Sequence, residues 1–341
     1  MDVKGMYTKI HRSITKILPA STPPPAQETT APPLAPKKTR EEWLNAGLTH
    51  FAAGQYRETV IDCDHALQLD PNDSTAYRYR GAAFALLKKY PKALEDYHHA
   101  ILLDPNNSET YRYRGDVFLA MKKYREALED YHHAIQLDPN DNSVYRYRGD
   151  AFYFLEKYQH ALQDYNRAIQ FDPADNIAYV RRGHAFALLK EYQKALKDYN
   201  QAIQLNPNDS TAYRYRGHAL YFLKQYEHAL EGCCQATRLD PKDSMAYFLQ
   251  GAIYNRQKKY KKAFEAYDQA IELDPNFAAA LNNRGLIYAK QFKQYHKALQ
   301  DFDHAIKLDP NDTIYRYNRA QVQLKLEGKV IAFFGRTIRL N

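Results

Sequence analysis

The stretch STAYRYRGAAFALLKKYPKALEDYHHAILLDPNN, residues 74–107, is followed directly by SETYRYRGDVFLAMKKYREALEDYHHAIQLDPND, residues 108–141. The two stretches align without a gap, so the chain repeats itself with a period of 34 residues. The period extends in both directions, because a proline recurs every 34 residues from Pro71 to Pro275 and once more after 35 residues. Placing this proline at position 32 of each repeat gives eight repeats over residues 40–312. Such a period predicts a stacked array of one supersecondary unit.

Each repeat shows the spacing of two helices, because its apolar residues recur at intervals of three, four and seven. Position 8 is glycine in every repeat, although glycine inside a helix costs about 1 kcal/mol relative to alanine. The missing side chain indicates that a second helix approaches closely there. Position 20, in the second half of the repeat, is also small, since it is alanine in every repeat but the first, which has Thr59. The sequence therefore predicts an all-α protein of paired helices.

The fixed positions of the repeat resemble a known signature. In the first repeat these positions hold Trp43, Gly47, Tyr56, Ala66 and Pro71. The set is similar to the tetratricopeptide repeat, and the next seven repeats carry it with few departures. The resemblance implies a right-handed superhelical solenoid of helix-turn-helix repeats over residues 40–312, with residues 313–341 as a degenerate ninth repeat that caps the end. It also implies that the first helices line a concave groove that binds other polypeptides.

Arginine and tyrosine alternate on the first helix of four repeats, in the string Tyr-Arg-Tyr-Arg-Gly. Both residue types are enriched in interface hot spots, so this pattern predicts a groove for an extended, acidic peptide. The alternative is that the arginines are solvated, or tied to Asp116 and Asp150 one helical turn away, and that the pattern reflects repeat duplication. The predicted groove residues are Arg78, Tyr79, Arg112, Tyr113, Asp116, Arg146, Tyr147, Asp150, Tyr153, His184, Arg214, Tyr215, His218 and Tyr221.

Arginine also occupies position 7 in six repeats, next to the glycine. These residues are Arg80, Arg114, Arg148, Arg182, Arg216 and Arg284. Because they lie beside the expected helix contact, we expect them to be half buried and to serve packing or salt bridges. The extra residue of the last repeat is expected within residues 290–294, between its two helices, where an insertion is tolerated best.

The first 39 residues break the period and form two pieces. Residues 1–18 show an apolar stripe at helical spacing with lysine and arginine on other faces, which predicts a basic amphipathic helix. Residues 19–39 are rich in proline and predict an extended linker. A helix this short is marginal alone, so we expect it to dock on a protein, on its own or a neighbouring array, or more weakly on a membrane surface. Its predicted docking residues are Met6, Ile10, Ile14 and Ile17.

Catalysis is not expected, because no Ser-His-Asp group, phosphate loop or paired-carboxylate site stands out against the repeats. No cofactor is expected either. The adjacent pair His98-His99 would point about 100° apart on a helix, which argues against a metal site. The cysteines Cys63, Cys233 and Cys234 show no pairing pattern, and the sequence has neither a secretory signal nor a long apolar run. These observations predict a cytoplasmic protein.

The net charge of +8 is concentrated at the N-terminus. Residues 1–40 hold seven basic and two acidic side chains, so the rest of the chain is nearly neutral. A single-stranded nucleic-acid binder would show more positive charge, and this function is disfavoured. The leading hypothesis is a scaffold that binds a protein or peptide ligand. The alternative is a structural protein that self-assembles, with its N-terminal helix docked on a neighbouring array.

Overall fold

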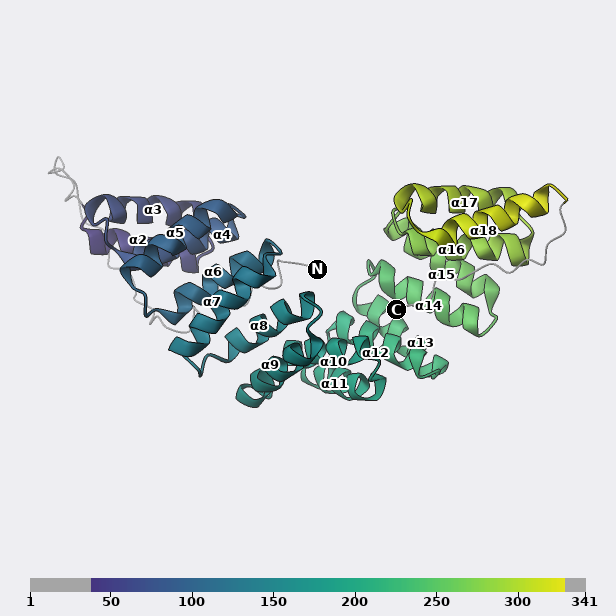
Figure 1. Ribbon diagram of the computed structural model, residues 1–341, viewed down its shortest axis with the longest axis horizontal. Helices are drawn as coiled ribbons and strands as arrows, with labels where there is room; N and C mark the ends of the chain where they lie inside the picture. Colours follow the sequence, from purple (N-terminus) through teal and green to yellow (C-terminus); the bar gives the residue numbers. More distant parts are fainter. Residues whose placement is uncertain (1–37, 329–341) are drawn as a thin grey trace, which may run out of the picture. The chain divides into compact units, whose positions relative to one another are not determined.

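The computed structural model describes residues 38–328, and this part of the chain is helical with no strand. It divides into two compact halves, Met1–Phe171 and Asp172–Asn341, which are described separately. The described part of the N-terminal half contains four helix pairs (Figure 1). They are α2 (Arg40–Ala52) with α3 (Tyr56–Leu69), α4 (Ser74–Leu86) with α5 (Tyr90–Leu103), α6 (Ser108–Ala120) with α7 (Tyr124–Leu137), and α8 (Asn142–Phe154) with α9 (Tyr158–Phe171).

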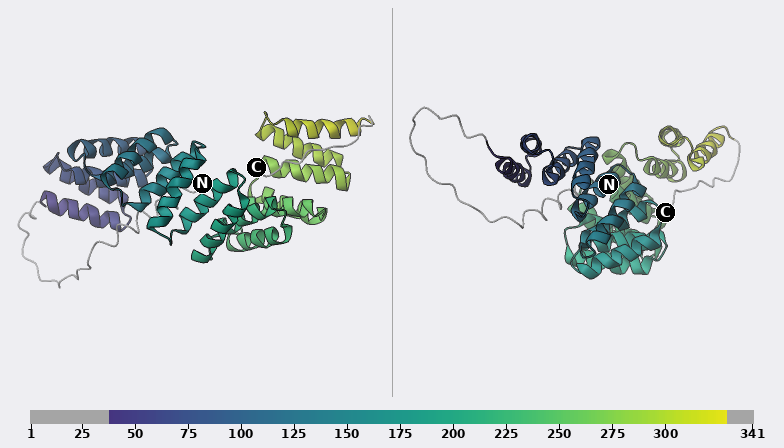
Figure 2. Two further views of the ribbon diagram at one scale, coloured as in Figure 1. Left: turned by 60° about the horizontal axis from the view of Figure 1, so that its bottom comes forward. Right: turned by 60° about the vertical axis from the view of Figure 1, so that its left-hand side comes forward.

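The described part of the C-terminal half contains four more pairs and a last single helix (Figure 2). They are α10 (Asn176–Leu188) with α11 (Tyr192–Leu205), α12 (Ser210–Phe222) with α13 (Tyr226–Leu239), α14 (Ser244–Arg256) with α15 (Tyr260–Leu273), α16 (Ala278–Ile287) and the π-helical turn η1 (Tyr288–Phe292) with α17 (Tyr295–Leu308), and then α18 (Thr313–Leu326). Within each half, the second helix of a pair packs on its own first helix and on the first helix of the next pair. The prediction of an all-α solenoid of helix pairs is confirmed.

Polar caps begin the first helices. The side chain of Thr39 accepts a hydrogen bond from the backbone N–H of Glu42, whose own side chain bonds back to Thr39, so α2 starts with a capping box. Most later first helices begin after an aspartate or asparagine at position 34, such as Asp73, whose Oδ1 accepts from Ala76 at 3.0 Å. A left-handed residue such as Lys88, with φ of 60°, closes the turn between the two helices of a pair. These local signals recur with the period and fix where each helix begins and ends.

The glycine at position 8 is required by the helix that packs on it. A Cβ added at Gly149 would lie 2.7 Å from Cε1 of Tyr165, and one at Gly251 would lie 2.6 Å from the ring of Tyr267. The expected close approach of a second helix is therefore present. The atoms that demand it belong to the aromatic residue at position 24 rather than to the small residue at position 20. A flat ring against a bare helix backbone lets the two helices of a pair lie close together.

The extra residue of the eighth repeat widens the end of its first helix. The helix α16 continues into η1. The left-handed residue Lys293 comes next, two positions before Tyr295, where α17 begins. Lys88 and Tyr90 show the same spacing in the second repeat, so the tight connection is unchanged and the surplus is absorbed in the helix. The insertion overlaps the expected residues 290–294 but lies largely in the helix rather than in the connection.

The predicted N-terminal helix and its docking residues Met6, Ile10, Ile14 and Ile17 lie outside the described residues. The linker lies outside them as well, except for residues 38 and 39. The same holds for residues 329–341 of the predicted cap. The part of the cap that is described is α18, which packs on α17 and buries Tyr315, Asn318 and Val322.

Candidate functional site: the first-helix faces

At position 5 of the first helices, four arginines lie over the ring of the tyrosine that follows each of them. In the N-terminal half the guanidinium carbon lies 4.9 Å from the ring centroid in the pair Arg78–Tyr79, 4.3 Å in Arg112–Tyr113 and 4.4 Å in Arg146–Tyr147. In the C-terminal half the pair Arg214–Tyr215 shows 4.6 Å. A guanidinium over a ring face is attracted by the ring's electrons, so each arginine is held in place by its neighbour. We call the surface formed by positions 5, 6, 9, 12 and 13 the first-helix face of each half.

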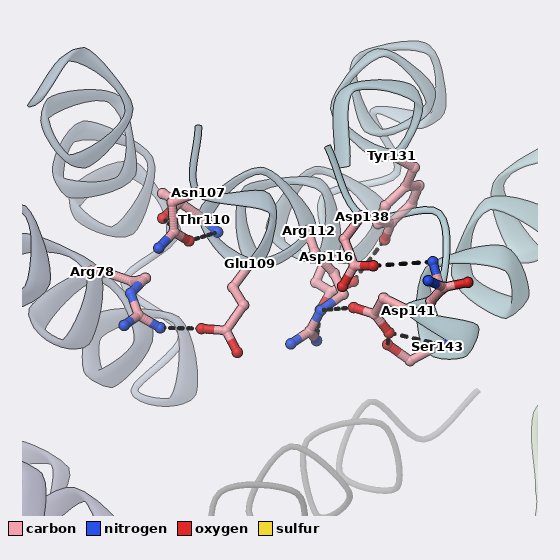
Figure 3. Close-up of polar contacts among 11 residues, drawn as sticks. Arg78, Asn107, Glu109, Thr110, Arg112, Asp116, Tyr131, Asp138, Asp141 and Ser143 are labelled. Carbon is pink, nitrogen blue, oxygen red and sulfur yellow. Dashed lines mark hydrogen bonds and ion pairs between the residues drawn. The ribbon is translucent and has the colours of Figure 1, made fainter. Parts of the chain in front are cut away.

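Acidic side chains of the chain itself pair with three of these arginines, namely Arg78, Arg112 and Arg214. Figure 3 shows Arg78 bonded to Glu109 and Arg112 close to both Asp116 and Asp141. The Arg112 guanidinium lies 3.2 Å from Asp141 and 3.9 Å from Asp116. Only 16% of the Arg78 side chain is exposed, whereas 50% of the Glu109 side chain is. The charge of these arginines is therefore already balanced within the protein. This is close to the alternative given in the sequence analysis, in which the arginines are tied to acidic residues of the chain itself.

The choice of partner follows from position 34. Asp141 caps α8 by accepting a hydrogen bond from the N–H of Ser143 at 3.0 Å, and the same carboxylate meets Arg112. In the preceding repeat this position is Asn107, which caps α6 but has no charge to offer, so Arg78 pairs with Glu109 instead. Arg112 and Arg214 at position 5 thus each join a first helix to the start of the next first helix, through an aspartate at position 34.

Two buried carboxylates lie beneath the face of the N-terminal half. The hydroxyl of Tyr131 donates to Asp116 at 2.8 Å, and that of Tyr165 donates to Asp150 at 2.7 Å. Burial raises the pKa of Asp116 to about 6, and the nearby guanidinium of Arg112 opposes this shift. Both carboxylates are almost completely buried, so they position neighbouring side chains instead of meeting a ligand directly.

Histidines replace these carboxylates in the C-terminal half. His184 stacks on Tyr215 with ring centroids 4.5 Å apart, and His218 lies edge-on to Phe222 at 5.0 Å. Burial lowers the pKa of each histidine to about 4, and nearby arginines, including Arg214 for both, add to the effect. Both imidazoles are neutral at pH 7, so this stretch of the face is aromatic and uncharged at position 9.

The fourteen predicted groove residues all lie on first helices, and none of them is fully exposed. Eight are half-buried, namely Arg78, Tyr79, Arg112, Tyr153, His184, Arg214, Tyr215 and His218. Six are buried, namely Tyr113, Asp116, Arg146, Tyr147, Asp150 and Tyr221. Tyr221 illustrates the second group, since its hydroxyl accepts a hydrogen bond from Nε of Arg256 at 2.9 Å. The half-buried set is the part that a ligand can reach.

Several polar residues that border the first-helix face have no counterpart in the sequence-based set. They include Glu109, Asp141 and Asp243. Their position in the repeat, 2 for the glutamate and 34 for the aspartates, is the sequence signal that could have identified them as partners of the arginines. A buried amide network near the C-terminal end was also missed. In it Asn318 donates to Asn282 at 2.8 Å, and Asn282 donates to Asn283 at 3.1 Å. These amides are buried and bond to one another, so they hold α16 and α18 together.

The arginines at position 7 form a second periodic feature, on the side where the two helices of a pair meet. In five repeats Nε donates to one aspartate oxygen at 2.8–2.9 Å and Nη2 to the other at 2.6–2.7 Å. The pairs are Arg80–Asp96, Arg114–Asp130, Arg148–Asp164, Arg182–Asp198 and Arg284–Asp301. The expectation of half-buried arginines in salt bridges is confirmed for these five. We call them the position-7 clamps.

Within residues 38–328 no group of three or more histidine, cysteine or acidic side chains is placed to hold a metal ion. His98 and His99 are exposed on α5, and the ring of His99 stacks on Tyr77. Cys63 and Cys233 are buried, and burial raises the pKa of both thiols.

None of the helices that the structure describes has the length and apolar character needed to span a membrane.

Comparison with known protein families agrees with this architecture. Tetratricopeptide repeat descriptions match residues 74–107, 108–141, 177–209 and 278–312, and a TPR repeat description matches residues 149–190 and 251–291. These matches cover more than half of the chain, which therefore belongs to the tetratricopeptide repeat family. A comparison with curated proteins finds no match.

Solved structures share the fold at low identity. A chain of the APC/C hetero-tetramer Cut9–Hcn1 is 16% identical with a TM-score of 0.62, and the alignment covers 94% of this chain but only 60% of that one. A tetratricopeptide repeat protein from Parabacteroides merdae is 17% identical with a TM-score of 0.58, over 73% of this chain and 98% of that one. PilF of Pseudomonas aeruginosa is 19% identical with a TM-score of 0.57, over 62% of this chain and 97% of that one. These likenesses concern the fold alone.

Proposed function

We propose that the chain is a non-catalytic scaffold that binds an extended, acidic polypeptide along its first-helix faces. The tetratricopeptide fold is typical of protein–protein interaction scaffolds. The observation that carries the finer proposal is the set of arginines stacked on tyrosines, which offers oriented guanidinium groups beside aromatic surface. Acidic residues of the chain already bind them, so their geometry suits carboxylates.

Arg78 is the arginine at which a ligand carboxylate meets the weakest internal competition. Its partner Glu109 is half exposed, and no other hydrogen bond or ion pair within residues 38–328 ties its side chain to the fold, so a ligand can replace it at low cost. Arg112 and Arg214 pair instead with aspartates that also cap a helix, and displacing those aspartates costs stability. The half-buried rings of Tyr79 and Tyr215 add apolar contact area on either half.

The test is selection of binders from a displayed library of random peptides, followed by affinity measurements with a selected peptide. We expect acidic sequences to be enriched. Arg78→Gln weakens binding because it removes the guanidinium, and Glu109→Gln strengthens binding because it removes the internal competitor. Arg125→Gln, which changes an exposed arginine on the second helix α7, is the matched control and leaves affinity unchanged. Enrichment of neutral or basic peptides, or equal affinities for all three variants, contradicts the proposal.

The amphipathic segment of residues 1–18 is the second part of the proposed function. Its apolar stripe and the proline-rich segment that follows favour a tethered docking element that engages a partner or another copy of the chain. This part rests on the sequence, and its test is described in the Discussion.

A further inference from the structure

One repeat lacks the carboxylate that its position-7 arginine needs. Arg216 on α12 occupies the same place as the arginines of the five position-7 clamps. Position 23, which supplies the aspartate in those clamps, is Gly232 on α13. Position 25 of the preceding repeat supplies a second carboxylate to Arg80 and Arg284, but here it is Asn200. Both sources of negative charge are therefore missing around Arg216.

The guanidinium of Arg216 shows the consequence. Its Nε is buried and has no hydrogen-bond partner among the residues that the structure describes. In each clamp the same atom donates to an aspartate oxygen at 2.8–2.9 Å. Arg216 keeps a cation–π contact with the ring of Tyr213 at 5.1 Å, which orients the group without neutralising it. A buried donor on a charged group that lacks a partner is costly, and an acceptor placed there recovers that cost.

The neighbouring charges do not fill the gap. Arg214 lies two residues away, but its Nε is bonded to Asp243 at 2.8 Å, so that carboxylate is already in use. Cys233 lies next to Gly232, and burial raises the pKa of its thiol far above neutrality, so the thiol carries no charge. Within the part of the chain that the structure describes, no ion pair thus compensates the charge on Arg216.

Arg216 is not fully enclosed by the protein. Side chains of the five clamp arginines are 16–20% exposed, and Arg216 is also half-buried, so the outer edge of the guanidinium meets solvent. Because residue 232 is glycine, no side chain at this position of α13 fills the place that the aspartate takes in the clamps. A planar guanidinium with two parallel donors selects a carboxylate in bidentate geometry.

We propose that Arg216 and Gly232 form a receptor site for an acidic side chain of a partner polypeptide, which pairs with the outer nitrogens of the guanidinium in place of the missing aspartate. The site lies where α12 and α13 meet, on residues distinct from those of the first-helix face. The proposal rests on the missing aspartate and is independent of the proposed peptide binding by the first-helix face. A glutamate suits it best, because its longer side chain reaches the guanidinium from the solvent side.

The test uses the full chain, with NMR signals of the arginine Nε–Hε groups recorded during titration with a hexaglutamate peptide. The Arg216 signal is assigned by its loss in Arg216→Lys. We expect this signal to shift saturably in the wild type. In Gly232→Asp an internal carboxylate occupies the site, and the peptide affinity reported by the Arg216 signal falls about tenfold or more, the worth of one charge-assisted hydrogen-bonded pair.

Gly232→Asn is the matched control, because asparagine has nearly the shape and helix propensity of aspartate but carries no charge. We expect Gly232→Asp to have a higher unfolding midpoint than Gly232→Asn. Four results overturn the proposal: no saturable shift with the peptide, the same peptide affinity in Gly232→Asp as in the wild type, a shift with inorganic phosphate alone, or equal midpoints of the two variants. The Arg78 signal reports the first-helix face separately, so failure of the groove proposal is distinguishable.

Discussion

Arg214 and Asp243 connect two consecutive first helices through one carboxylate. Nε of Arg214 on α12 donates to Oδ2 of Asp243 at 2.8 Å, and Oδ1 of the same aspartate accepts from the N–H of Ala246 at 3.0 Å to cap α14. Asp243 therefore serves both as a helix cap and as the ion-pair partner of the preceding repeat. Arg214 and Arg112 therefore stabilise the contact between consecutive first helices, in addition to any role in binding.

Replacing Asp243 by asparagine separates its role as a helix cap from its role as an ion-pair partner. Asparagine retains the capping oxygen but loses the charge, so Asp243→Asn is expected to destabilise the protein through the lost pair with Arg214. Asp209 is the matched control, since it caps α12 through Ala212 at 3.1 Å but is approached by the amide of Asn176 instead of an arginine. Thermal unfolding followed by circular dichroism should show a larger drop in midpoint for Asp243→Asn than for Asp209→Asn. Equal drops would mean that the Arg214 pair adds no stability.

The glycine contacts predict a graded response to one added methyl group. In Gly149→Ala the new Cβ would lie 2.7 Å from Tyr165, which forces the ring or the helix to move, and overpacking of this kind costs about 1–3 kcal/mol. In Gly47→Ala the nearest atoms are 3.3 Å away, on Asp62 and Cys63, so the change is mild and the gain in helix propensity offsets part of it. Denaturation midpoints measure the difference. A Gly149→Ala protein as stable as Gly47→Ala contradicts the role assigned to the Tyr165 ring.

The fold could be predicted from the sequence because its information is periodic and local. Glycine at position 8, the aspartate or asparagine caps and the left-handed turn residues each recur every 34 residues, so one repeat explains the others. The location of the eighth-repeat insertion was less certain, because a helix end can absorb a residue as a π turn as readily as a connection can lengthen. That choice depends on packing and not on local preference.

The candidate site was harder to predict, because the exposure of a side chain depends on neighbouring repeats. Arg78 and Arg112 occupy the same position in identical local sequence, yet Arg78 pairs with a half-exposed glutamate and Arg112 with a helix cap. The difference comes from one residue in the following segment, Asn107 against Asp141. Likewise Asp150 looks like a surface residue in the sequence, but the hydroxyl of Tyr165 and the packed helices bury it.

The predicted docking segment has a direct test in solution. Deletion of residues 1–36 should lower the mass measured by light scattering if the segment joins molecules. If it instead occupies the first-helix face of its own chain, the mass stays constant and peptide affinity rises. Ile10→Asp with Ile14→Asp should mimic the deletion, because docking would bury unpaired charges. Lys9→Gln is the control, since it leaves the apolar stripe intact. Unchanged mass, peptide affinity and membrane or partner binding in the deleted protein would show that the segment is passive.

The buried histidines of the C-terminal half predict a loss of stability in mild acid. His184 and His218 have pKa values of about 4 in the folded chain, below the usual 6.5, because burial and nearby arginines disfavour the charged form. Unfolding lets both residues bind a proton at a higher pH. Their contribution to stability is therefore complete above pH 6.5 and is lost as the pH falls toward 4, at about 1.4 kcal/mol per pH unit for each histidine.

Asp116 acts in the opposite direction over part of this range, because its raised pKa of about 6 makes the folded chain favour the protonated carboxyl. The histidine effect is isolated by comparing the wild type with a His184→Leu, His218→Leu double variant, in which Asp116 is unchanged. Leucine occupies this position in two other repeats, at Leu48 and Leu286, so the fold accepts it. We expect the stability difference between the variant and the wild type, from urea denaturation, to shift in favour of the variant between pH 6.5 and 4. A difference that stays constant over this range would show that the two imidazoles titrate in the folded chain as they do in water.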